Sequence, residues 1–386
     1  AWRQASESGA QVVRDKAGYL APAAPKEVLQ HCGGLQLTSL GLASMPFKHD
    51  GTEVDWGAGI RSAWNFGEEE ALKMFANFCS ESLPTYETQR HLADASTVSR
   101  LSPYIHFGVI SPRCMLEEME ARGYERMAPT FLRRLVWRDL AYWQLYHWPA
   151  LPYQPVRPSY VARLWAADSP RLLVAWQKGR TGYPMVDAAM RELWATGWMH
   201  QSMRTVVACF LVGACGVDWR AGARHFHYTL VDADLAINSM MWQSAGQCGL
   251  DQWGFWASPT AGKQDPGGAW VRRWVPELAG LPTRFVHQPW EAPRDLLLDS
   301  NVILGENYPH RIVADVERAR SSHLQSVNAS RMSVREWVDE DGYDLIDIPP
   351  GAVKNGTFHG SKIRVFTTRG HRKISETKPS LKKFKK

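Results

Sequence analysis

Helical periodicity is the feature of this 386-residue sequence that most restricts its fold. It dominates residues 63 to about 331, where strand patterns are scarce and turns such as KGRTGYP and DPGG separate the periodic segments. Within residues 131–147, one stripe carries four apolar side chains: Leu132, Val136, Leu140 and Trp143. The sequence therefore predicts an all-α, multi-helical domain over residues 61–331.

The segments on either side of this domain differ from it in composition. Residues 1–60 are poorly patterned and show no alternation of strands and helices, so they leave no room for a complete α/β domain. Residues 332–353 are expected to form an acidic, proline-containing linker. The tail, residues 354–386, holds eleven Lys or Arg and only one acidic residue, which predicts disorder. Such a tail either attracts nucleic acid or another anionic surface through counterion release, or serves solubility or targeting.

Cysteine usage and apolar content indicate a reducing, intracellular environment. The six cysteines are scattered without a C-x-x-C pair, so the sequence indicates no zinc or other metal site and no disulfide framework. The longest apolar run, Thr205 to Val217, is too short to span a bilayer, and no membrane segment is expected. The sequence does not distinguish the nucleus from an organelle as the compartment.

The stretch from Trp219 to Gln243 concentrates aromatic and polar residues in otherwise helical sequence. Asp232 and Asp234 stand two residues apart, and the amide of Asn238 follows four residues after the second. This compact set of acceptors and donors suits the edge of a ring that carries N–H groups. The alternative is structural, with the aspartates as an N-cap and its neighbour and the tryptophans as core residues.

A second motif lies in residues 97–113, at the predicted start of a helix. Its hydroxyl side chains at Thr97, Ser99 and Ser102 accompany Arg100. Hydroxyls and free backbone N–H groups at a helix start make a cradle for phosphate oxygens. Ordinary helix capping is the alternative explanation.

These motifs and several further blocks resemble the photolyase/cryptochrome family in order and spacing. The further blocks are KGRTGYPMVDAAMRELWATGWMHQSMR from Lys178, DPGGAWVRRWVPELAGLP from Asp265, HQPW from His287 and NYPHRIV from Asn307. The resemblance covers roughly residues 63–313 and implies an all-α domain that holds FAD, folded, at the base of a cavity. The family's N-terminal α/β domain, which houses an antenna pigment, has no counterpart among these blocks.

The resemblance also implies which residues hold FAD. Those expected at the diphosphate or the ribityl chain are Tyr86, Ser99, Leu101 and Ser102, with Arg138 nearby. Arg204 and Asp232 match a paired cation and carboxylate beside the isoalloxazine ring, while Asp232 and Asp234 are expected to face polar atoms of the ring and the ribityl chain. Asn238 is expected to face flavin N5, where an amide can hydrogen-bond a protonated nitrogen, as in photolyases.

Three tryptophans resemble the family's relay, which passes electrons from the surface to a photoexcited flavin. Trp242 and Trp219 match directly. Trp165 matches with a one-residue shift in its spacing to Trp176, so a packing role is the alternative for it. The frequency of tryptophan, 18 residues in all, suits both a relay and an aromatic core.

Positions that contact damaged DNA in photolyases match less well. Trp137 and Arg90 stand where aromatic and basic contacts belong, but Arg134 replaces the glutamate of cyclobutane-dimer photolyases. Gln201 replaces an asparagine, and Ser244 replaces a second stacking tryptophan. The departures favour a cryptochrome-like photoreceptor that signals to a protein partner. The alternatives are a DNA photolyase, which flips a pyrimidine dimer into the cavity, and a light-independent flavoprotein or DNA-binding scaffold.

Overall fold

The computed structural model describes residues 47–93, 95–348 and 362–368, so the leader at 1–46 and most of the basic tail lie outside the described residues. The chain divides into two compact units, Ala1–Ala58 and Gly59–Lys386. In the described part of the first unit, Phe47 pairs with Glu53 in an antiparallel bridge that closes a short turn. The site described below belongs entirely to the second unit.

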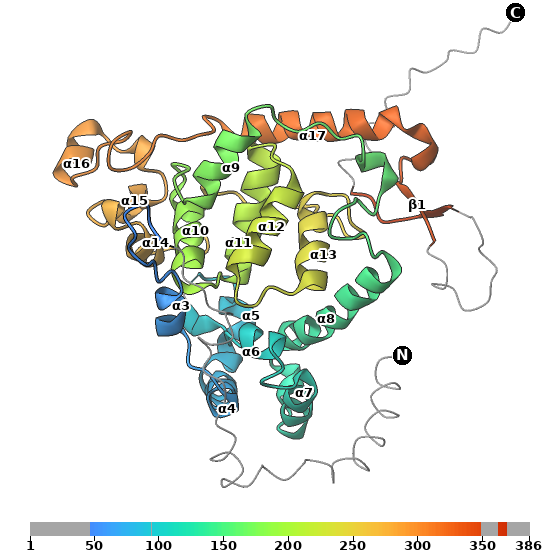
Figure 1. Cartoon of the computed structure of the whole chain (residues 1–386), viewed down its shortest axis with the longest axis horizontal. Coiled ribbons are helices and arrows are strands. Elements are labelled where there is room, and N and C mark those ends of the chain that lie inside the picture. Colours follow the sequence, from blue (N-terminus) through green and yellow to red (C-terminus); the bar gives the residue numbers. More distant parts are fainter. Residues whose placement is uncertain (1–46, 94, 349–361, 369–386) are drawn as a thin grey trace, which may run out of the picture. The chain divides into compact units, whose positions relative to one another are not determined.

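The second unit is built almost wholly of helices, which confirms the predicted all-α class (Figure 1). Its first helices are α3 (Ala58–Ala63), α4 (Glu68–Asn77), α5 (Tyr86–Gln89), α6 (Ser102–His106), α7 (Pro112–Ala121) and α8 (Pro129–His147). The central helices are α9 (Ser169–Gln177), α10 (Pro184–Thr196), α11 (Gln201–Cys209), α12 (Trp219–Thr229) and α13 (Leu235–Ala245). The last helices are α14 (Ala269–Trp274), α15 (Thr283–Val286), α16 (Arg294–Asp299) and α17 (Val316–Ser333).

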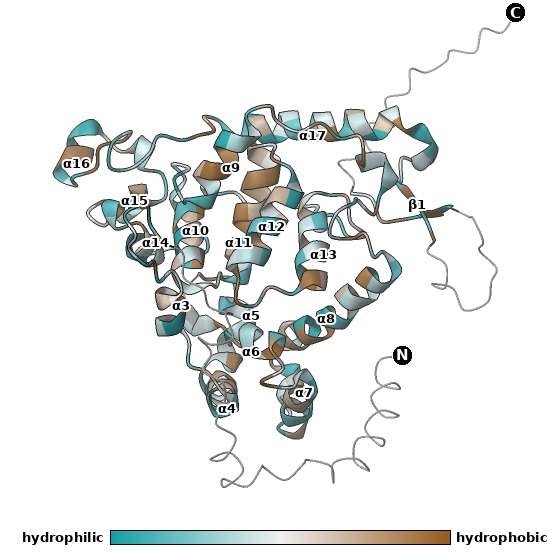
Figure 2. Ribbon diagram, viewed as in Figure 1, coloured by the Kyte–Doolittle hydropathy of each residue, from teal (hydrophilic) through white to brown (hydrophobic). Residues whose placement is uncertain are grey.

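The main core includes most of the buried side chains of the central helices α10 to α12 and part of α13. The ribbon coloured by hydropathy shows hydrophobic residues on α9 and α11 in this region (Figure 2). Local signals fix the ends of these helices. Pro184 stands in the first turn of α10, and Gly197 ends that helix in the left-handed conformation, with φ of 69°. Asp218 and Asp234 cap α12 and α13 by accepting backbone N–H groups of the first turn. The apolar faces of the four helices meet around buried aromatic residues.

Helix α8 differs from the amphipathic stripe predicted for it. Leu140 and Trp143 are 41% and 45% exposed, whereas Phe131 and Ala141 are buried. The first half of α8 lines a cavity, and these exposed side chains lie in its second half, outside the cavity lining. Hydrophobic periodicity identified the helix correctly but not the face that it buries.

The described residues of the expected linker and of the expected tail include two short strands. Strand β1 (Leu345–Asp347) pairs antiparallel with β2 (Lys362–Arg364), with Ile346 opposite Ile363. Ile346 is 1% exposed and packs in a small cluster with Leu151 and Val156. The prediction of disorder from residue 354 onward is therefore wrong for residues 362–368, because hydrophobic side chains and a buried ion pair hold this stretch in place.

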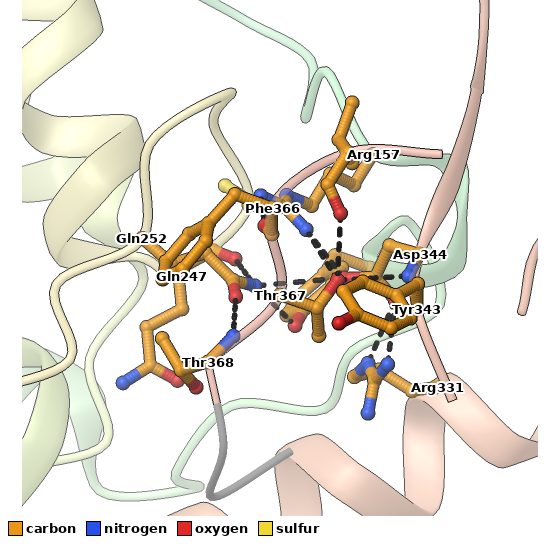
Figure 3. Close-up of polar contacts among 12 residues, drawn as sticks. Arg157, Gln247, Gln252, Arg331, Tyr343, Asp344, Phe366, Thr367 and Thr368 are labelled. Carbon is orange, nitrogen blue, oxygen red and sulfur yellow. Dashed lines mark hydrogen bonds and ion pairs between the residues drawn. The ribbon is translucent and has the colours of Figure 1, made fainter. Parts of the chain in front are cut away.

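That ion pair belongs to a cluster formed by Arg157, Arg331 and Asp344, here called the Asp344 cluster (Figure 3). Asp344 is fully buried and accepts hydrogen bonds from Arg157 Nη1 at 2.7 Å and from Arg331 Nε at 2.8 Å. Arg157 also donates to the carbonyl oxygens of Gly249 and Phe366, at 2.6 Å each. The cluster thus joins the loop after α13 to the C-terminal segment that contains β2.

Candidate functional site

A cavity of about 620 Å³ lies between α6, α8, α11 and α13 and has the size of a cofactor site. It brings together most of the residues predicted to contact a cofactor or a substrate: Tyr86, Arg90, Ser99, Leu101, Ser102, Arg134, Trp137, Arg138, Gln201, Arg204, Asp232 and Asp234. The predicted residues that do not line it are Thr97, Asn238, Trp165, Trp219 and Trp242. Sequence motifs up to 150 residues apart therefore meet at one site.

Arg204 and Asp232 form the predicted pair of cation and carboxylate. Arg204 Nη2 donates to Asp232 Oδ2 at 2.7 Å. The other carboxylate oxygen, Asp232 Oδ1, is buried and has no hydrogen-bond partner among the described residues. A buried acceptor without a donor is unfavourable, so this oxygen suits a ligand that presents an N–H group to it.

Asp234 has the capping role that the sequence allowed for it, and its second oxygen has partners of its own. Its Oδ1 accepts the backbone N–H of Ile237 at 3.0 Å and so caps α13. Its Oδ2 accepts the hydroxyl of Tyr142 at 2.8 Å and lies 3.5 Å from Arg138 Nη2. The residue is therefore a structural cap that also lines the cavity together with its partner Arg138.

Asn238 is not among the residues that line the cavity. Its Nδ2 donates to the carbonyl oxygen of Ala223 at 2.9 Å, which ties α13 to α12. Its neighbours Ile237 and Met241 line the cavity instead. Contact of Asn238 with flavin N5 remains a prediction.

The predicted phosphate cradle contains a strained arginine that the sequence reading left without a role at the cavity. Arg100 has φ of 53°, a left-handed conformation that is unfavourable for any residue except glycine. Its guanidinium lies between the rings of Trp64 and Trp198, at 4.6 and 5.0 Å from their centroids. Trp198 also donates to Ser102 Oγ at 3.2 Å, so the loop is held from two sides.

Trp198 is a second lining residue that the sequence analysis passed over. The sequence signal for Trp198 was the preceding residue, Gly197. This glycine ends α10, and the chain then turns towards the cavity. An added Cβ at Gly197 would approach Val231 to 2.5 Å. This position therefore needs glycine for its conformation and for its close packing.

The entrance side of the cavity is rich in arginine. Arg90, Arg133 and Arg134 line it together with the partly exposed ring of Trp137. Burial lowers the pKa of Arg134 and raises the pKa of Tyr86, which stands next to it. The three guanidinium groups give this side of the cavity positive charge, which favours an anionic ligand.

The three relay candidates lie behind the cavity rather than in its wall. Trp242 and Trp219 are buried, and Trp165 is half-buried. Gly222 lets Trp242 approach α12, since an added Cβ there would lie 2.2 Å from the indole. Trp176, which the sequence analysis did not assign to the relay, packs edge-on against Trp242 with 6.2 Å between ring centroids.

No group of three or more His, Cys, Asp or Glu side chains in the described part of the chain is placed to hold a metal ion. Among the helices that the structure describes, none combines the length and the apolar character needed to cross a bilayer.

Comparison with known proteins identifies the domain. Residues 131–329 match the family model described as the FAD binding domain of DNA photolyase. A deoxyribodipyrimidine photo-lyase from Agrobacterium fabrum is 37% identical over 72% of this chain and 59% of its own length. Cryptochrome-1 from Arabidopsis thaliana is 33% identical over 79% of this chain and 48% of its own length. The chain thus spans about half to three fifths of these relatives.

The solved structures agree with the sequence matches. A bacterial class III photolyase from Agrobacterium tumefaciens superposes with a TM-score of 0.71 and 35% identity, over 78% of this chain and 62% of the other. The site fits FAD, because Asp232 Oδ1 offers a buried acceptor to a ring N–H and the arginines offer charge to a diphosphate. The chain therefore belongs to the photolyase/cryptochrome family and contains its FAD-binding domain.

Proposed function

We propose that this chain is a blue-light-absorbing flavoprotein in which Trp165, Trp219 and Trp242 pass electrons from the surface to bound FAD. The observation that carries the proposal is the position of these three tryptophans, which lie behind the cavity. Trp242 stands on α13, the helix from which Ile237, Met240, Met241 and Ser244 line the cavity. The ring of Trp219 lies against Gly246 at the end of that helix. Trp165 and Trp219 line one further cavity together.

The protein side of this chemistry consists of binding, orientation and exclusion of water. Bound FAD supplies one-electron redox chemistry, and the chain tunes it. Asp232 and Arg204 orient the ring edge, and the arginines beside the loop around Arg100 neutralise the diphosphate. The buried tryptophans lie in a core from which water is excluded, so an electron can pass between them without a mobile carrier.

Within this function we favour a photosensory role. Gln252 lines the cavity, and its Oε1 accepts the backbone N–H of Thr368 in the C-terminal segment at 3.0 Å. A change of charge at the flavin can therefore alter contacts of the segment that leads into the basic tail. A protein partner that binds the tail is the expected receiver of the signal.

The proposal is tested by loading the protein with FAD and illuminating it with blue light in the presence of a reductant. We expect tight binding of FAD and loss of the oxidised absorption band, because the cavity retains Asp232, Asp234 and the arginine lining. The measurement is the visible spectrum during illumination, with a dark sample as control. Protein that cannot be loaded with FAD would contradict the proposal.

A further prediction concerns the residue expected at flavin N5. Replacing Asn238 by aspartate removes the Nδ2 donor that holds the carbonyl of Ala223, and it adds a negative charge close to the cavity. We expect a different reduced species to accumulate, because the added charge disfavours an anionic ring. The check is the spectrum of the illuminated protein and its decay in the dark, and identical spectra and decays in both proteins would rule out a role at N5.

A DNA photolyase is the second candidate, and the arginine-lined entrance with Trp137 is the observation in its favour. Light-driven repair requires the flavin to donate an electron to a pyrimidine dimer flipped into the cavity. Trp137 is 36% exposed and could stack on such a base. The positive entrance could bind the backbone of the damaged strand.

Binding to DNA with and without a pyrimidine dimer separates the two candidates. The test protein should end at Thr368, because a cut at Pro350 would also remove β2 and Thr367. If the signalling role is correct, binding without the tail is weak and shows no preference for the lesion. If the cavity recognises damage, Trp137→Ala weakens lesion binding by about 1–3 kcal/mol, whereas Trp143→Ala on the exposed face of α8 does not.

A further inference from the structure

A second cavity, of about 330 Å³, lies next to the outer part of the proposed relay. Trp165 and Trp219 both line it, together with Tyr160, Val161 and Arg163, and we call it the Trp219 cavity. It shares no lining residue with the FAD cavity. Its volume is about ten times that of a water molecule in the liquid, so it can hold a small organic molecule.

Arg163 gives this cavity its chemical character. The side chain is 7% exposed, and its guanidinium donates to the carbonyl oxygen of Gly246 at 2.8 Å and contacts the ring of His323 at 2.6 Å. Burial lowers its pKa to about 10, so it keeps its charge at neutral pH. Among the described residues, no carboxylate lies within ion-pair distance of it. The nearby Asp218 is bound to Arg220 instead.

A buried cation without a counter-ion is costly, and an anion in the adjoining space would offset this cost. The walls restrict what kind of anion fits. Arg163 lies 4.0 Å over the ring of Trp165, and the ring of Trp219 and the side chain of Tyr160 add aromatic surface. Flat aromatic side chains in the wall favour a planar organic body, and the guanidinium favours a carboxylate or an enolate on its edge.

We propose that the Trp219 cavity binds a small planar organic anion that serves as the electron donor of the relay. The inference rests on the relay proposed above. After Trp165 or Trp219 has given up an electron, the bound anion transfers one electron to it. The donor is thereby oxidised by one electron and releases a hydroxyl proton to water, while the indole returns to its neutral form. No covalent bond forms with the protein. Enediolates such as ascorbate belong to this class of donor.

Binding is measured first, in the dark, by calorimetric titration of ascorbate into the FAD-loaded protein. We expect saturable binding that Arg163→Gln weakens by about tenfold or more, because a charge-assisted hydrogen bond is lost. Val161→Trp, at a lining residue that is 67% exposed, should block binding by filling the space without touching the buried charge. Arg171→Gln is the matched control, since Arg171 is exposed on α9 and pairs with Asp168. The visible spectrum of bound FAD and the thermal midpoint confirm that each variant is folded.

The kinetic arm measures the rate of photoreduction under constant light against donor concentration. With ascorbate the rate should saturate at the concentration that half-saturates binding, and Val161→Trp should abolish this saturation. With dithiothreitol, which is neutral and not planar, the rate should rise linearly with concentration and be the same in the parent protein and in Val161→Trp. Three results would each overturn the inference. They are a lack of saturable binding in the dark, unchanged binding in both Arg163→Gln and Val161→Trp, and equally effective displacement of ascorbate by inorganic sulfate. If the proposed relay is wrong, ascorbate still binds in the dark, but Trp219→Phe does not change the rate of photoreduction.

Discussion

Trp242→Phe should retain FAD but lose most of its photoreduction. The indole is buried against α12 and makes none of the polar contacts that line the cavity, so its removal affects electron supply rather than cofactor binding. Phenylalanine fits the same space and is much harder to oxidise. We expect the rate at which the oxidised band disappears under blue light to fall by about tenfold or more, which corresponds to a barrier higher by about 1.4 kcal/mol.

Two control variants make this result specific. Trp270→Phe removes another buried indole of the same core, on α14 and outside the proposed relay, and should leave the rate unchanged. Trp176→Phe tests the neighbour whose ring centroid lies 6.2 Å from that of Trp242. If Trp242→Phe photoreduces as fast as the parent, electrons arrive by another path. If Trp176→Phe is the slow variant instead, that path leaves the relay at Trp176.

Asp344→Asn should destabilise the protein more than any other conservative change in the C-terminal segment. Arg157 and Arg331 are 0% and 1% exposed, and Asp344 is the carboxylate that pairs with both. An amide of the same shape leaves two buried guanidinium groups without a counter-charge. Breaking a buried pair in this way typically costs about 3–5 kcal/mol. The measurement is the free energy of unfolding from urea titration, followed by tryptophan fluorescence.

Asp341→Asn is the matched control for this prediction. Asp341 undergoes the same chemical change three residues away, but its side chain is 61% exposed and its partner is the surface residue Arg364. Solvent screens such a pair, so the control should unfold at nearly the parent urea concentration. Equal midpoints for Asp344→Asn and Asp341→Asn would mean that the Asp344 cluster does not hold the C-terminal segment in the folded protein.

The sequence predicted much of the site because the chemistry of each motif is local. The hydroxyls and backbone of residues 97–102 and the carboxylates of residues 232–234 sit within single turns, so their spacing alone indicates what they can bind. The capping role of Asp234 was likewise readable, since a cap and the N–H that it accepts are three residues apart. Family resemblance then placed these motifs around one cofactor, and the cavity contains them.

Helix orientation was harder to predict because periodicity does not say what a helix faces. The apolar stripe of α8 gave the right element but the wrong buried face, since part of its surface lines a cavity. Asn238 is similar, because its rotation on α13 towards Ala223 depends on how α13 packs on α12. A single sequence holds no record of that packing.

The sequence determined the helical class and the cap of α13, and with the family resemblance it indicated many of the residues that line the cavity. Only the tertiary structure decided where the C-terminal segment goes and where charge is buried. Arg157 and Asp344 are 187 positions apart, and Arg163 and His323 are 160 apart. The physical reason is the separation in sequence between the residues that interact. A cap or an amphipathic turn is stabilised by neighbours in sequence, whereas a buried charge is tolerated only where distant segments together provide its partners and exclude water.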